Sequence, residues 1–65
     1  MTQTDQQKVI NKGFTIIRAD YFRKEIKFKS KENLQWKVWD KGFKTKKAME
    51  NTMRELLEKS NFIED

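Results

Sequence analysis

The sequence contains no cysteine, no histidine and no proline, and only two of its 65 residues are glycine. Without cysteine, the chain can form neither a disulfide nor a thiolate metal site that would stabilise so short a domain. Without histidine, it lacks the commonest metal ligand and the commonest general base at neutral pH. Stability must therefore come from packing, and a chain of this length buries only about 60% of the surface that its unfolded form exposes.

Features typical of enzymes and of membrane proteins are also missing. The acidic residues Asp20, Glu25, Glu32 and Asp40 are scattered, with no spacing that forces two carboxylates together. The glycines do not form a phosphate-binding loop, and no acidic cluster has the loop spacing of a metal site. No apolar run approaches the roughly 20 residues that span a bilayer, and the start lacks a signal-peptide pattern. We therefore expect no catalysis, no cofactor and no membrane association, and a cytoplasmic location.

Aromatic residues are abundant for this length: five phenylalanines, two tryptophans and one tyrosine. Each can bury a large area, which favours a folded core although 38% of the residues are charged. The length allows a single domain over residues 1–65. Residues 1–8 are polar without periodicity, and this predicts a loose tail. Alternatively, Thr4 or Asp5 begins a short helix that ends before Gly13 and depends on docking.

The rest of the chain has strand patterns followed by a helix pattern. Residues 14–19 are rich in β-branched and aromatic side chains. Residues 25–29 alternate polar and apolar with period two, and so do residues 34–40 apart from Trp39. Residues 20–24 and 30–33 read as turns. From Thr45, a plausible N-cap, apolar residues recur at helical spacing, with Met49, Met53 and Leu56 among them. The prediction is an α+β fold in which a three-stranded antiparallel sheet packs against one C-terminal helix.

Period two also assigns residues of the second and third strands to faces. The expected helix-facing side carries Ile26, Phe28, Leu34, Trp36 and Val38. The opposite side then carries Glu25, Lys27, Lys29, Gln35, Lys37 and Trp39. The phase of the first strand stays open because Ile16 and Ile17 compete for the core, so Arg18 joins either side.

The charge is positive and unevenly distributed. Residues 1–44 carry eleven basic and five acidic side chains, a net +6, whereas residues 45–65 have a net −1. Lysines on an exposed sheet can serve solubility and prevent edge-to-edge aggregation. Alternatively, Lys27, Lys29 and Lys37 contact phosphates while Trp39 stacks on a base or sugar. These two interpretations are about equally supported.

The densest basic segment is residues 41–47, where Lys44, Lys46 and Lys47 flank the helix start. Lysines are unfavourable in the first turn of a helix, whose free N–H groups bind anions. The segment is therefore either a solvated loop and cap or a phosphate contact.

The stretch from Gly42 to Glu50, GFKTKKAME, resembles the strand-to-helix junction of arm-type DNA-binding domains in tyrosine recombinases of phages and transposons. Those domains have a three-stranded antiparallel sheet and a C-terminal helix, and the outer face of the sheet enters the DNA major groove. The resemblance implies that Lys27, Lys29, Lys37 and Trp39 face DNA and that Lys46 and Lys47 lie near phosphates. The double-stranded RNA-binding domain is a second resemblance, through its helix, three strands and helix with paired lysines.

Two functions are consistent with these features. The first is a nucleic-acid-binding module, for duplex DNA before RNA, with Arg18 and Lys44 added to the contact residues. The second is a regulatory module from a mobile element, such as a small inhibitor or adaptor, that binds an acidic protein partner. A monomer or a weak homodimer fits either function.

Overall fold

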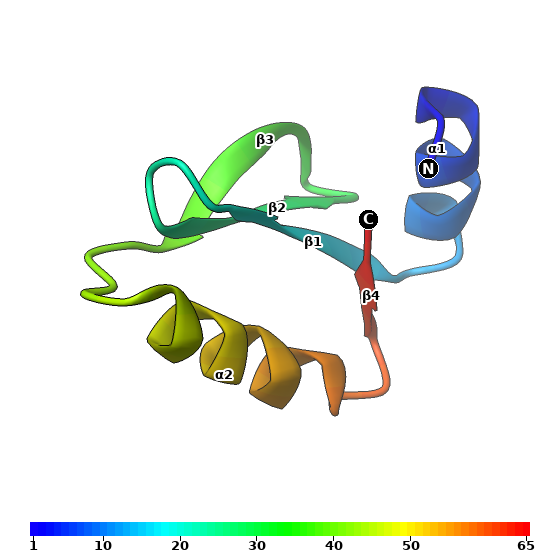
Figure 1. Ribbon diagram of the computed structural model, residues 1–65. Coiled ribbons are helices and arrows are strands. Elements are labelled where there is room, and N and C mark those ends of the chain that lie inside the picture. The colour runs from blue at the N-terminus through cyan, green and yellow to red at the C-terminus, as the bar shows by residue number, and fades with distance from the viewer.

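Two helices lie on opposite sides of a four-stranded sheet in the computed structural model, which describes all 65 residues (Figure 1). The elements are α1 (Gln3–Asn11), β1 (Thr15–Asp20), β2 (Glu25–Ser30), β3 (Asn33–Asp40), α2 (Lys46–Leu57) and β4 (Phe62–Glu64). The strand order is β3-β2-β1-β4, antiparallel except for the parallel pair of β1 and β4. The predicted α+β class and the three antiparallel strands are confirmed. The fourth strand was not part of the expected architecture, whereas the docked first helix was one of the two alternatives for the N-terminal residues. Neither helix is long and apolar enough to cross a membrane.

Helix α2 forms where the sequence predicts it. The Thr45 hydroxyl accepts a hydrogen bond of 3.1 Å from the Ala48 backbone N–H, which caps the first turn. Met49, Met53 and Leu56 follow at i, i+4 and i+7 and are buried. They form the core with Ile17 and Ile26 of the sheet, and Phe43 packs against its margin. We call the sheet face that meets α2 the inner face.

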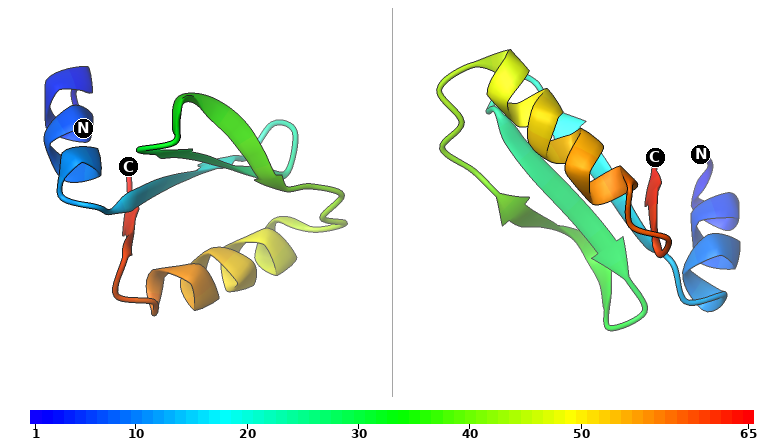
Figure 2. Two further views of the ribbon diagram at one scale, coloured as in Figure 1. Left: turned by 180° about the vertical axis from the view of Figure 1, so that it is seen from behind. Right: turned by 90° about the horizontal axis from the view of Figure 1, so that it is seen from below.

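Helix α1 covers one end of the other side of the sheet, which we call the outer face (Figure 2). Its first turn is capped by Thr2, whose hydroxyl accepts from the Asp5 N–H at 3.1 Å. The two competing isoleucines of β1 are both buried. Ile17 lies on the inner face in the core with α2, and Ile16 lies on the outer face, where Ile10 of α1 is also buried. The prediction of a loose tail at residues 1–8 is wrong, because docking on Ile16 stabilises a helix too short to persist alone.

Strand β4 extends the sheet on the far side of β1. The Thr15 N–H donates to the Asn61 carbonyl at 2.8 Å, and the Asp65 N–H donates to the Ile17 carbonyl at 2.9 Å. The C-terminal residues therefore lie beside β1 and close to α1, as both views in Figure 2 show. This pairing protects the start of β1 from being an open edge.

The phase of β3 is opposite to the predicted one. Lys37 pairs with Phe28 and Val38 pairs with Lys27, so Lys37 lies on the inner face and Val38 on the outer face. The hairpin register already sets this phase, because Ser30 pairs with Asn33. The ladder between β2 and β3 is also irregular at two places. Leu34 and Val38, expected in the core, are 53% and 45% exposed. The inner side of β3 instead contributes Trp39, whose ring lies 5.3 Å from Phe28 and 5.4 Å from Phe62 in edge-to-face contacts.

Candidate nucleic-acid interface

Three basic side chains gather around a tryptophan on the outer face. Arg18 and Lys27 are direct partners across β1 and β2, and Lys29 follows on the same side of β2. Trp36 of β3 lies beside them, with the Arg18 guanidinium 5.5 Å and the Lys29 Nζ 4.8 Å from its ring centroid. We call Arg18, Lys27, Lys29 and Trp36 the outer cluster. Each cation over the indole gains about 0.5–1 kcal/mol at an exposed site.

Trp36 is the member of this cluster that the sequence pattern misassigned. Period two placed it among core residues, whereas its ring is half-buried and meets two cations. The signal that identifies it is the packing of Trp39: once Trp39 occupies the inner face between Phe28 and Phe62, alternation sends Trp36 outward.

A buried glutamine holds Lys29 in place. Gln6 of α1 accepts a hydrogen bond of 3.0 Å from the Lys29 Nζ and donates one of 2.9 Å to the Asp65 carboxylate. Asp65 also lies 3.5 Å from the N-terminal ammonium of Met1. Burial raises the pKa of Asp65, but the hydrogen bond from Gln6 and the ammonium charge outweigh it, so the net pKa is lowered. This chain of contacts joins α1, β2 and the C-terminus and directs Lys29 toward Trp36.

Lys27 makes the one side-chain ion pair of the protein. Its Nζ lies 3.1 Å from Oδ2 of Asp20, while Oδ1 of Asp20 accepts the backbone N–H groups of Phe22 and Arg23. The backbone bond from Arg23 and then the bond from Lys27 hold the pKa of Asp20 below its ordinary value. The carboxylate therefore closes the β1–β2 turn and also partly neutralises Lys27, which leaves Arg18 and Lys29 as the less compensated charges of the cluster.

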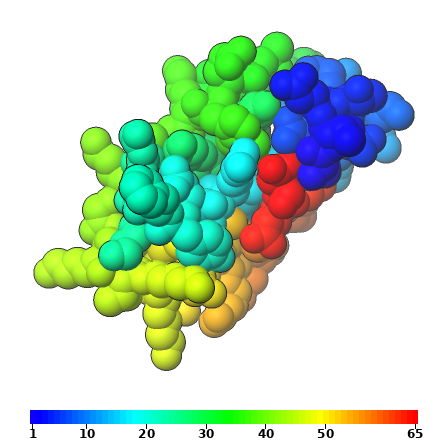
Figure 3. Space-filling view, turned by 45° about the horizontal axis from the view of Figure 1, so that its top comes forward, coloured from blue at the N-terminus to red at the C-terminus, as the bar shows by residue number.

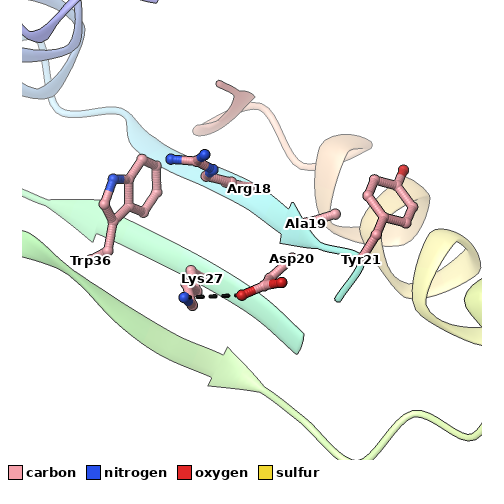
Figure 4. Close-up of a pocket in the computed structure, with 6 residues that line it drawn as sticks. All are labelled: Arg18, Ala19, Asp20, Tyr21, Lys27 and Trp36. Atoms are coloured by element: carbon pink, nitrogen blue, oxygen red, sulfur yellow. Dashed lines mark ion pairs between the residues drawn. The ribbon is translucent and has the colours of Figure 1, made fainter. Parts of the chain in front are cut away.

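A hollow of about 390 Å³ lies on the outer face beside the cluster. Figure 4 shows Trp36 at one end, Tyr21 at the other, and the Asp20–Lys27 pair between them. Arg18 points toward Trp36, in agreement with its cation–π distance. The lining residues are Arg18, Ala19, Asp20, Tyr21, Lys27 and Trp36.

The basic start of α2 contacts Tyr21, which lines the opposite end of this hollow. The Lys46 Nζ lies 5.0 Å from the ring centroid of Tyr21, so each end of the hollow has an aromatic ring with a cation over it. Lys44 and Lys47 are exposed nearby in sequence, and no acidic side chain occupies the first turn of α2. Figure 3 shows long side chains from the segment before and at the start of α2 standing out from the surface.

Two of the predicted contact residues lie elsewhere. Lys37 is exposed on the inner side of β3, opposite Phe28, and Trp39 packs against Phe28 and Phe62 with 44% of its surface exposed. Neither shares a face with Lys27 or Lys29, because the hairpin register pairs Ser30 with Asn33 and Phe28 with Lys37 and so sets β3 in the other phase. The structure thus brings together Arg18, Lys27 and Lys29, and separates Lys37 and Trp39 from them.

Few of the basic side chains are paired with an acidic one. Of the 15 lysine and arginine side chains, only Lys27 forms a salt bridge. No group of three or more acidic side chains gathers where it could hold a metal ion. The outer face is therefore suited to bind anions next to the partly exposed rings of Trp36 and Tyr21.

Comparison with known proteins supplies no relative: no family model, no curated protein and no solved structure matches the chain.

Proposed function

We propose that this domain binds nucleic acid, duplex DNA in the first place, through its outer face. The observation that carries the proposal is the outer cluster, in which Arg18 and Lys29 lie over Trp36 without a carboxylate partner. Free cations of this kind release counterions when they meet phosphates, and this release drives most of the affinity of such contacts. The similarity of residues 42–50 to recombinase arm-type domains supports DNA over RNA.

The contact set differs from the one that the sequence suggested. Arg18, Lys27 and Lys29 remain in it, Trp36 replaces Trp39, and Lys37 leaves it because it lies on the inner face. Lys44, Lys46 and Lys47 extend the surface past Tyr21. With about three or four phosphates neutralised, the logarithm of the binding constant should fall against the logarithm of salt with a slope of roughly −3 to −4.

A matched pair of lysines tests this assignment. Lys29 and Lys37 are both lysines on neighbouring strands, but they lie on opposite faces of the sheet. The change Lys29→Gln should weaken duplex binding and reduce the salt slope by about 1, whereas Lys37→Gln should leave both unchanged. Fluorescence anisotropy of labelled duplex DNA at several salt concentrations measures both quantities. Equal losses from the two variants would refute an outer-face interface.

A protein partner is the second candidate function, and one observation favours it. β3 is an edge strand of eight residues that exposes Leu34 and Val38, and such edges accept an added strand from a partner. An interface of this kind depends on backbone pairing and apolar contact, so it should respond weakly to salt. Binding that survives high salt and is lost on Leu34→Lys would favour the protein partner over DNA.

A further inference from the structure

The hollow on the outer face has the features of a site for a single base. Aromatic rings stand at its two ends, Trp36 and Tyr21, and a cation lies over each of them, Arg18 and Lys46. Its volume of about 390 Å³ falls within the range of roughly 300–1,000 Å³ in which small ligands bind. A flat phosphate-binding surface needs no such hollow and no aromatic side chains beside its cations.

The charges along the hollow favour a ligand that has a neutral ring in the middle and phosphates at its two ends. The Asp20 carboxylate accepts from Lys27 and from two backbone N–H groups, so the central charges compensate each other. The net positive charge therefore lies at the ends, on Arg18, which lines the hollow, and on Lys46, which lies over Tyr21 outside the lining. A nucleotide strand has the same arrangement, because each base is flanked by the phosphate before it and the phosphate after it.

We infer that this hollow receives one unpaired nucleotide, whose base stacks on Trp36 while Arg18 moves from the indole to the adjacent phosphate. Lys29 stays on Trp36, since it does not line the hollow and is held by Gln6. The base of an intact duplex reaches this ring only after unstacking, which costs a few kcal/mol. The domain therefore prefers a duplex that carries an unpaired nucleotide, such as a short overhang, over the same duplex with blunt ends. This inference rests on the proposed function.

The test uses one DNA stem in three forms: blunt, with a short thymidine overhang, and with the same overhang built from abasic sites. The abasic form keeps the phosphates and removes only the bases. We expect the thymidine overhang to bind about fivefold to about hundredfold more tightly than the abasic one, the range for stacking one base on an aromatic side chain. Trp36→Ala should remove this difference, so that the thymidine and abasic overhangs bind the variant equally.

The two tryptophans provide an internal control, because replacing either one with phenylalanine keeps an aromatic side chain at each position of the fold. Trp39→Phe leaves Trp36 as the sole tryptophan, and its emission should be quenched by the thymidine overhang but not by the abasic one. Trp36→Phe leaves Trp39 on the inner face, and its emission should not respond. Equal binding of the three DNA forms, or a response from Trp39 instead of Trp36, would overturn the inference and leave the proposed function standing. Absence of binding to every form at low salt would overturn both.

Discussion

Replacing Ile26 or Leu34 by alanine tests the phase of β3 directly. Each change removes three carbon atoms, and the sequence pattern assigns both residues to the core. In the structure Ile26 is fully buried against α2, whereas Leu34 is 53% exposed on the outer side of β3. The two substitutions should therefore differ greatly in their effect on the free energy of unfolding.

The expected size of the effect follows from burial. Truncating a fully buried isoleucine costs about 2–5 kcal/mol, through lost transfer free energy and the cavity left behind. An exposed position usually changes stability by no more than about 0.5 kcal/mol, and the half-exposed Leu34 should cost less than about 1 kcal/mol. At roughly 0.05–0.15 kcal/mol per residue, this chain of 65 residues has a total stability of roughly 3–10 kcal/mol. Ile26→Ala thus removes a large part of the total.

Urea unfolding followed by far-ultraviolet circular dichroism measures both variants against the parent. If Ile26→Ala does not fold, Ile26→Val gives a smaller cost of about 0.5–1.5 kcal/mol that can still be compared with Leu34→Ala. A cost for Leu34→Ala equal to that of the isoleucine variant would show that β3 has the phase of simple alternation. The outer cluster around Trp36 would then not exist.

Three further changes probe the contacts that hold the elements in place. Thr45→Ala should lower the free energy of unfolding by about 1 kcal/mol, because it removes the N-cap of α2, and Thr45→Ser should retain most of it in the same urea assay. Gln6→Ala should lower the free energy of unfolding by about 1–3 kcal/mol, because it removes the hydrogen bonds to Asp65 and Lys29. The same change at the exposed Gln7 should be nearly neutral. Equal effects of the two changes would contradict the docking of α1. The pKa of Asp20 in the folded protein is below the ordinary 3.8, so its contribution to stability is present above that pH and lost as the pH falls through the folded value. The urea midpoint of Asp20→Asn should therefore fall less between about pH 6 and about pH 3 than the midpoint of the parent protein. An equal fall in the two proteins would show that Asp20 does not contribute to this pH dependence.

Local patterns in the sequence were sufficient for the elements themselves. The alternation of residues 25–29 and 34–40 predicted β2 and β3, and the turn residues between them lie where the chain reverses. The Thr45 cap and the spacing of Met49, Met53 and Leu56 predicted α2 and its buried side. Each of these features depends on residues within a few positions of one another, which is why the sequence alone determined them.

Tertiary contacts decided what the sequence left open. β4 spans only three residues, too few for a periodic signal, and it exists because β1 offers an edge to pair with. Helix α1 is stabilised by docking over Ile16 and by the hydrogen bonds of Gln6 to Lys29 and Asp65, which lie far along the chain. The face of β3 depends on Trp39, which packs between Phe28 and Phe62, and on the hairpin register that pairs Phe28 with Lys37. The period-two pattern identifies the two faces of β3, and each face carries a tryptophan. Only packing against the rest of the fold selects the face that meets the core. This selection places Trp36 on the outer face with Arg18 and Lys29.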